Sequence, residues 1–304
     1  MWLEITKHKF VKYFTRYIVL IKEYYLNKNL AIWSGLLLYS DVYKVDFQLK
    51  GGTMRRIFFL IVFILIGTLS GAEYKTITFP SADSLEITAD LYMPHDNTAP
   101  FIILFHRAHW SRGEYREIAP KLNAMGFNCL AVDQRSGSEI NGVKNETAAR
   151  AQALGKPTTY VDALQDMQAA LEFVHQNFAK GKLIIWGSSY SSSLVLILAG
   201  RNEKIIDGVL AFSPGEYFSR LGKPDNYIQT HVKRLNCPVF ITSAKDEAAN
   251  CKPIYKAIPS EKKVVFTPQT EGIHGSQALW ESTPDNAAYW KEVKKFLQQF
   301  VEKK

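Results

Sequence analysis

The sequence has little cysteine, and its few cysteines form no pattern typical of a metal site. The 304 residues include only three, Cys129, Cys237 and Cys251. None belongs to a Cys-x-x-Cys pair or a Cys/His cluster, so we expect no bound metal. Cys129 lies in an apolar run and is expected to be a buried thiol. Whether Cys237 and Cys251 form a disulfide stays open from the sequence alone.

Long hydrophobic runs are also missing. The apolar stretches at residues 17–21 and 30–39 are short, and the unbroken run at residues 57–67 has 11 residues. A helix that spans a bilayer needs about 20. No heptad pattern, internal repeat or Pro/Gly/Ser-rich linker divides the chain after residue 72, so we expect a single domain at residues 73–304.

Residues 54–72 match the three parts of a secretory signal peptide. Met54-Arg55-Arg56 is a short basic start, residues 57–67 are apolar, and residues 69–72 supply small side chains before a cut after Ala72. The alternative is a buried helix. The basic flank and the small-residue exit favour export, so we expect a periplasmic or secreted protein with no stable membrane anchor after cleavage.

The 53 residues before Met54 carry no recognisable functional pattern. Lys50-Gly51-Gly52 can be encoded by a purine-rich ribosome-binding sequence, and it ends one codon short of Met54. We therefore expect translation to start at Met54 and residues 1–53 to be a non-native upstream extension. The alternative is a genuine extension of unknown role.

The positive charge of the chain is concentrated in this leader. Residues 1–72 contain 10 of the 37 basic side chains and 4 of the 29 acidic ones. Residues 73–304 therefore contain 27 basic and 25 acidic side chains, and little of the formal net charge of +8 belongs to them. The charge balance gives no reason to expect a nucleic acid or a membrane surface as partner.

From Tyr74 onward, strand-like and helix-like segments alternate, which is typical of an α/β sheet with mostly parallel strands. The expected strands are residues 74–79, 85–92, 101–105, 128–132, 183–186, 208–212, 238–243 and 264–267. The expected helices are residues 115–125, 159–178, 192–199 and 286–301. Residues 136–157 are polar and weakly periodic, so we expect them to run over the surface near a functional site.

The segment Gly187-Ser188-Ser189-Tyr190-Ser191 lies between an expected strand and an expected helix. A serine with a small residue two before and two after it, at a strand-to-helix turn, is typical of a nucleophile elbow. Only Ser189 has Gly187 two positions before it and the apolar run ending just ahead. We therefore predict that Ser189 is a nucleophile.

Serine needs a base within hydrogen-bond reach and an acid that orients the base. His274 lies on a glycine-flanked loop after the last expected strand, and Asp246 is the first carboxylate after the strand at residues 238–243. Ligands in parallel sheets bind at the carboxyl ends of strands, where both loops start. We predict His274 as the base and Asp246 as the acid, with Glu247 as the runner-up.

These residues, in the order Ser189, Asp246, His274, resemble the α/β-hydrolase superfamily, and in particular its compact dienelactone-hydrolase-like members. The strand at residues 101–105, which ends in His106-Arg107-Ala108, adds to the resemblance. It implies a mostly parallel sheet with helices on both faces and no large cap domain. Two departures are Ser191 and Arg107, each of which stands where glycine is commoner.

The resemblance also implies an oxyanion hole formed by the backbone N–H groups of Tyr190 and Ala108. Arg107 is either a cation that faces the substrate or an ion-pair partner of Asp133, and Arg135 is a second candidate for substrate binding. The expected activity is a serine hydrolase that cleaves a small ester, thioester or amide through an acyl-enzyme, without a cofactor. The alternatives are a peptidase, an acyltransferase and a non-catalytic binding protein on the same fold.

Overall fold

The computed structural model describes residues 73–301. The expected upstream extension (1–53) and signal peptide (54–72) lie outside these residues, so both stay predictions. Within residues 73–301, no helix is both long enough and apolar enough to cross a membrane.

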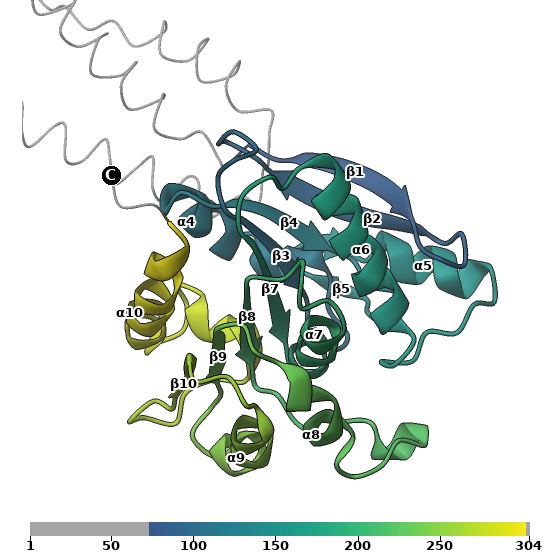
Figure 1. The fold of residues 1–304 in the computed structure, drawn as a ribbon. Coiled ribbons are helices and arrows are strands. Elements are labelled where there is room, and N and C mark those ends of the chain that lie inside the picture. Colours follow the sequence, from purple (N-terminus) through teal and green to yellow (C-terminus); the bar gives the residue numbers. More distant parts are fainter. Residues whose placement is uncertain (1–72, 302–304) are drawn as a thin grey trace, which may run out of the picture. The chain divides into compact units, whose positions relative to one another are not determined.

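An eight-stranded sheet forms the centre of the described region (Figure 1). Its strands are β1 (Lys75–Pro80), β2 (Glu86–Tyr92), β3 (Phe101–Phe105), β4 (Asn128–Val132), β7 (Leu183–Ser188), β8 (Gly208–Phe212), β9 (Val239–Thr242) and β10 (Lys263–Phe266). They are arranged in the order β1-β2-β4-β3-β7-β8-β9-β10. The pairs β1–β2 and β2–β4 are antiparallel and the other pairs are parallel. The predicted mostly parallel sheet is confirmed.

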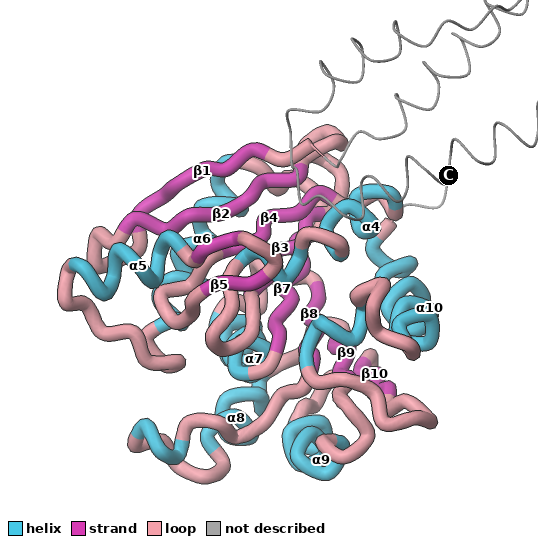
Figure 2. Tube along the Cα trace, turned by 180° about the vertical axis from the view of Figure 1, so that it is seen from behind, coloured by secondary structure: helices cyan, strands magenta, loops and turns pink. Residues whose placement is uncertain are grey.

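Helices cover both faces of this sheet, as the opposite views in Figures 1 and 2 show. The helices are α4 (Ile118–Ala124), α5 (Glu146–Ala153), α6 (Ala163–Asn177), α7 (Tyr190–Arg201), α8 (Tyr227–His231), α9 (Ala248–Ala257) and α10 (Asn286–Leu297). One core cluster contains α6, α7 and alternate residues of β3, such as Ile103. The cluster on the other face contains α4, α10 and the remaining β3 residues, such as Leu104. Both faces of β3 are buried because residue alternation sends its apolar side chains to both cores.

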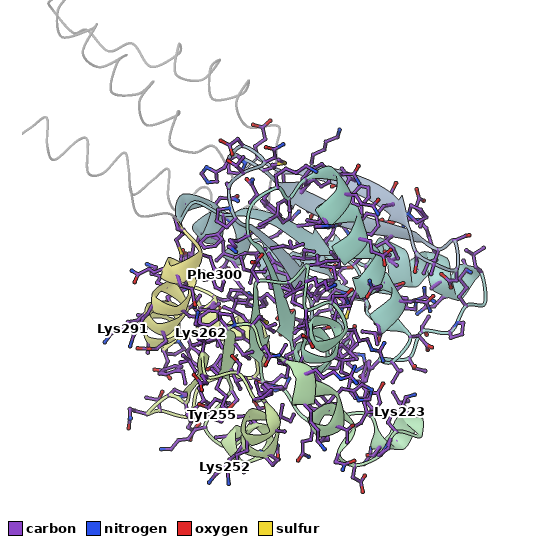
Figure 3. The ribbon with its side chains drawn as sticks, in the orientation of Figure 1. Lys223, Lys252, Tyr255, Lys262, Lys291 and Phe300 are labelled. Atoms are coloured by element: carbon purple, nitrogen blue, oxygen red, sulfur yellow. The ribbon has the colours of Figure 1, made fainter. Side chains whose placement is uncertain are left out.

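The closing helix α10 packs in this second core, and the short 3-10 helix Gln298–Phe300 follows it. The ring of Phe300, labelled in Figure 3, lies so close to Gly208 that a Cβ added there would be 2.4 Å from it. Any larger residue at the start of β8 would have to displace this ring. The exposed side of α10 carries Lys291, which points away from the sheet (Figure 3).

The segment 136–157 is more ordered than the sequence predicted. It forms a short hairpin, β5 (Glu139–Ile140) with β6 (Val143–Lys144), followed by α5. Asn145 is buried because its side chain caps α5 by accepting from the Ala148 N–H (2.8 Å) and donates to the Gln134 carbonyl (2.9 Å). The segment lies largely at the surface, as expected, but its hairpin and helix were not predicted, because a capping side chain with long-range partners carries no periodic signal.

The cysteines are all free thiols. Cys129 is buried in β4, as predicted. Cys251 donates its thiol to the Pro214 carbonyl (3.2 Å) instead of pairing with Cys237. The structure therefore contains no Cys237–Cys251 disulfide.

Candidate active site

Ser189 lies at the turn between β7 and α7 with a backbone conformation that is rare for a non-glycine residue. Its φ is 58° and its ψ is −125°. Such a conformation costs about 1–3 kcal/mol and persists only where surrounding contacts hold it. The Ser189 N–H donates to the Phe212 carbonyl at the end of β8 (2.8 Å), which fixes the turn against the neighbouring strand. The structure thus places Ser189 on a strained strand-to-helix turn of the kind the sequence predicted.

The residues on either side of Ser189 explain why the turn needs small side chains. A Cβ added at Gly187 would lie 2.3 Å from the Ser191 carbonyl oxygen, so only glycine fits. Ser191 fits where glycine is commoner because its hydroxyl is used inside the protein. It donates to the His106 carbonyl (2.6 Å) and accepts from the Gln134 amide (2.5 Å). Ser191 is therefore a buried structural serine.

His274 pairs with Glu247, not with the predicted Asp246. Its Nδ1 is hydrogen-bonded to Glu247 Oε1, whereas Asp246 is exposed to solvent. The turn after β9 directs Asp246 outward and places Glu247 at the start of α9, facing the histidine loop. The prediction that Asp246 contacts the histidine was wrong. Glu247, the second choice from the sequence, makes this contact.

Ser213 is a further residue of this site, and sequence reasoning missed it. It follows β8 with a φ of 59°, and its hydroxyl donates to Glu247 Oε2 (2.7 Å) and accepts from the Gly275 N–H (3.0 Å). Burial works to raise the pKa of Glu247, but the hydrogen bonds from His274 and Ser213 outweigh it and leave that pKa below its ordinary value. Ser213 therefore fixes both the acid and the loop that carries the histidine. Its position directly after a parallel strand was the signal that could have found it.

Ser189 and His274 approach the same end of the sheet from different loops. The histidine loop is tied to the elbow because the Ser276 N–H donates to the Ser188 hydroxyl (2.9 Å). In the described structure, Ser189 and His274 share no direct hydrogen bond. Catalytic hydrogen bonds are often long without substrate and shorten when it binds. The hydroxyl of Tyr217, which donates to the Ser213 carbonyl (2.5 Å), also lies beside Ser189.

Two backbone N–H groups lie on loops of this site, one at Tyr190 directly after Ser189 and one at Ala108 after β3. Tyr190 is the first residue of α7, where an N–H has no partner within the helix, and Ala108 follows β3 on a loop. Among residues 73–301, neither N–H has a hydrogen-bond acceptor. The arrangement fits an oxyanion hole, which requires free N–H groups aimed at a developing negative charge.

His106 shapes the loop that carries Ala108. The side chain is fully buried, and burial lowers the pKa of His106 to about 4, so the ring is neutral at pH 7. Its Nε2 accepts from the Gln134 N–H (3.1 Å), while Nδ1 lies 2.8 Å from the Arg107 carbonyl and is assigned as the protonated nitrogen. This histidine is a structural residue and has no access to a substrate.

Arg107 lies at the rim of the site. Its guanidinium stacks on the Trp110 ring at 4.5 Å and donates to the His274 carbonyl (3.3 Å). The alternative partner that the sequence suggested, Asp133, is instead paired with Arg112, whose Nη1 lies 2.5 Å from Asp133 Oδ2. Among residues 73–301, Arg107 forms no ion pair with a carboxylate.

Arg135, the second arginine predicted to bind substrate, is a structural residue. Its side chain is fully buried and forms ion pairs with Asp166 (2.7 Å) and Asp83 (3.0 Å). The hydrogen bond from Arg135 holds the pKa of Asp83 well below its usual range. With its donors used by two carboxylates, Arg135 is not available to a substrate, and the prediction was wrong.

Glu114 is a buried acid beneath the site that no sequence motif indicated. It belongs to the short 3-10 helix Arg112–Tyr115, and its side chain has no exposed surface. Oε1 accepts from the Ser188 hydroxyl (2.7 Å) and Oε2 accepts from the Arg107 N–H (2.7 Å). Burial raises the pKa of Glu114 to about 7.

No cluster of three metal-ligating side chains occurs in the part of the chain that the structure describes.

Comparisons with known proteins agree with this geometry. The family model described as "Serine aminopeptidase, S33" matches residues 96–219, which include the turn at Ser189 and the loop that carries Ala108. No curated protein matches the sequence. An esterase of Pyrococcus furiosus is similar in structure, with 18% identity and a TM-score of 0.59 over 76% of this chain and 93% of that chain.

Two further solved structures have the same fold. Dienelactone hydrolase from Anabaena variabilis is 12% identical, with a TM-score of 0.59 over 76% of this chain and 100% of that chain. Est1E from Butyrivibrio proteoclasticus, solved with ferulic acid bound, is 16% identical, with a TM-score of 0.56 over 75% of this chain and 99% of that chain. No cap domain is evident in the described residues. The described residues therefore have the α/β-hydrolase fold, similar to that of dienelactone hydrolase and of these esterases.

Proposed function

We propose that this protein is a serine hydrolase that cleaves a small ester, thioester or amide through an acyl-enzyme. The observation that carries the proposal is the strained turn at Ser189 together with the His274–Glu247 pair on loops anchored to the same end of the sheet. A nucleophile, a base and an orienting acid from three separate strand ends are the parts that acyl transfer needs.

In this mechanism the Ser189 hydroxyl oxygen attacks the carbonyl carbon of the substrate. His274 takes the proton at Nε2, because Nδ1 is held by Glu247, and then gives it to the leaving group as the carbonyl re-forms. The Glu247 carboxylate stabilises the imidazolium that forms in between. Water then attacks the acyl-enzyme with the same proton transfers, and the acid is released while Ser189 regains its proton.

The Tyr190 and Ala108 N–H groups donate to the negative oxygen of both tetrahedral intermediates. Neither has an acceptor among residues 73–301, so no internal hydrogen bond has to break when the oxyanion forms. Preorganised donors of this kind contribute about 3–4 kcal/mol each to transition-state stabilisation.

Arg107 is the remaining candidate for a substrate contact. Its guanidinium lies at the rim beside His274 and has no carboxylate partner among the described residues. Arg135, the second candidate from the sequence, is buried and paired with two carboxylates. Arg107 is proposed to contact the substrate. This contact alone does not indicate a class of substrate.

A second candidate function is a peptidase that removes amino-terminal residues. It is favoured by the description of the family model, which names a serine aminopeptidase. The same Ser189, His274 and Glu247 would act on an amide, so the two functions differ only in which substrate fits. A panel of short and long acyl esters, acyl thioesters and amino-acid arylamides separates them.

The direct test of the proposal is labelling by a fluorophosphonate probe, which reacts with an activated serine. We expect labelling of the wild-type protein and none of Ser189→Ala. A folded wild-type protein that is neither labelled nor active on the panel would favour a non-catalytic binding protein on this fold.

We also propose that residues 54–72 direct export and that the working protein begins at Glu73. The support is the basic, apolar and small-residue pattern of that segment. Amino-terminal sequencing of protein made from the native upstream DNA tests it. Recovery of peptides from residues 1–53 would contradict the predicted start, and a product that retains residues 57–67 would contradict the cut.

A further inference from the structure

Glu114 occupies a position that the proposed mechanism does not use. It has no hydrogen bond with Ser189, His274 or Glu247, and its carboxyl group is enclosed by protein. Among residues 73–301 it forms no ion pair with lysine, arginine or histidine. An ionisable group that is buried without a cation is costly, so its presence calls for a reason beyond packing.

The hydrogen bonds of Glu114 join three loops that carry the proposed catalytic groups. Oε2 accepts from the Arg107 N–H (2.7 Å), one residue before the proposed oxyanion donor at Ala108. Oε1 accepts from the hydroxyl of Ser188 (2.7 Å), one residue before the nucleophile. That hydroxyl in turn accepts from the Ser276 N–H (2.9 Å), two residues after the histidine.

The histidine loop packs closely against the turn that carries Ser188 and Ser189. A Cβ added at Gly275 would lie 2.5 Å from Ser188 Oγ, so the backbone next to the histidine rests directly on the Ser188 hydroxyl. Trp186 adds a further tie because its indole N–H donates to the Ser276 hydroxyl (2.9 Å). A shift of Ser188 would therefore move the histidine loop and the elbow together.

A carboxylate suits this position better than an amide does. Both of its oxygens face donors, an N–H on one side and an O–H on the other, and a carboxylate accepts at both ends. A glutamine of the same shape would present an NH₂ group to one of them. The Ser188 hydroxyl would then have to give up its present acceptor and lose its fixed orientation.

We propose that Glu114 is a positioning residue, which holds the elbow, the oxyanion loop and the histidine loop in register through the Ser188 hydroxyl and the Arg107 N–H. It acts on the reaction through these two groups and does not touch the substrate. The inference rests on the proposed hydrolase function, because register between the three loops matters only if they act on one substrate.

The test compares Glu114→Gln, Ser188→Ala and the double variant with the wild type, using an ester from the panel that the wild type cleaves. We expect each single variant to lower kcat by about 10- to 100-fold while KM changes by less than about 3-fold, since small misplacement of reacting groups has effects of this size. The double variant should fall no further than the more severe single variant, because both remove one network. Circular dichroism and thermal unfolding establish that the variants are folded.

The matched control is Glu117→Gln, which alters a carboxylate on the same segment that accepts only from the Glu281 N–H at the surface (2.9 Å). It should retain wild-type kcat and KM. A folded Glu114→Gln protein with wild-type kcat, or losses that multiply in the double variant, would overturn the positioning role. A wild-type protein that is neither labelled by fluorophosphonate nor active would overturn the hydrolase function and this inference with it.

Discussion

Two sets of buried or partly buried carboxylates lie in this domain, and they are stabilised in different ways. On the β2–β4 side of the sheet, Asp133 is paired with Arg112, and Asp166 is paired with Arg135. At the candidate site, Glu114 accepts from a hydroxyl and a backbone N–H. Glu247 accepts from Ser213 and pairs with His274.

The difference separates structural acids from acids that can take part in chemistry. A guanidinium keeps its proton at any ordinary pH, so a carboxylate bound to it always has a cation as its partner. A histidine exchanges its proton near neutral pH, and hydroxyl and N–H donors leave a carboxylate free to respond to a change in charge nearby. The arginine-paired acids should therefore affect stability, and the acids at the site should affect turnover.

The largest effect is expected from the nucleophile of the proposed site. Ser189→Ala should abolish fluorophosphonate labelling and lower kcat by about a millionfold, as removal of a catalytic serine does in other hydrolases. Stability should change little, because the strained turn is held by backbone contacts. The matched control is Ser191→Ala, which should still be labelled. Labelling of Ser189→Ala but not of Ser191→Ala would move the nucleophile to Ser191.

The next largest effect distinguishes the two adjacent acids after β9. Glu247→Gln should lower kcat by about ten-thousandfold, because loss of the orienting acid leaves the histidine in the wrong tautomer. Asp246→Asn should change kcat by less than about 3-fold, since Asp246 is exposed. Steady-state kinetics on one ester measure both. A large loss in Asp246→Asn with an active Glu247→Gln would contradict the geometry.

The arginine-paired set is tested by Arg135→Met. Removal of this cation leaves Asp166 buried without its partner, so the free energy of unfolding should fall by about 3–5 kcal/mol. The activity per folded molecule should stay near that of the wild type. The control is a surface pair. Lys182→Met removes an exposed contact with Asp207 and should lower the free energy of unfolding by less than about 1 kcal/mol.

Denaturant unfolding measures the stability of both variants. An Arg135→Met protein that is stable but inactive would place Arg135 in the site after all.

The sequence was sufficient to predict the sheet. The strands β3, β4 and β8 have the bounds that were expected, because each is an apolar run enclosed by turn residues. The positions of Ser189 and His274 on loops at strand ends followed from the same pattern, since parallel strands place their carboxyl ends together.

The choice between neighbouring carboxylates could not be predicted in the same way. Asp246 and Glu247 both follow β9, and only the geometry of the turn decides which of them faces His274. The first carboxylate after the strand was chosen from spacing alone. The turn directs Asp246 to solvent, and the next residue, Glu247, contacts His274 instead. The prediction and the structure therefore differ by one residue.

The partners of the buried charged side chains could not be predicted from the sequence either. Arg135 pairs with Asp83, which is 52 residues away in sequence, and that pairing has no local signal. Glu114 is the clearest case, because its partners come from loops on both sides of it in the chain and none forms a motif with it. Long-range pairing of polar groups is set by the packed fold, so it becomes visible only in three dimensions.

The smallest predicted effect is on stability, and it concerns Glu114 again. Its pKa in the folded protein is raised by burial from the ordinary 4.5 to about 7. Between these two values the folded protein keeps a proton that the unfolded chain has lost, so this group's contribution to stability is complete below about pH 4.5 and is lost as the pH rises through about 7. The loss amounts to about 3 kcal/mol for a shift of this size.

Glutamine does not titrate, so Glu114→Gln should remove this pH dependence. The unfolding free energy of the variant minus that of the wild type should rise by about 3 kcal/mol between about pH 4 and pH 8, because the other ionisable groups titrate in both proteins and cancel. Urea unfolding at a series of pH values measures the difference. A flat line for Glu114→Gln would mean that the buried carboxyl has an ordinary pKa. A line with the expected slope, together with reduced kcat in the same variant, would show that a charge which weakens the fold at neutral pH is retained because it serves the site.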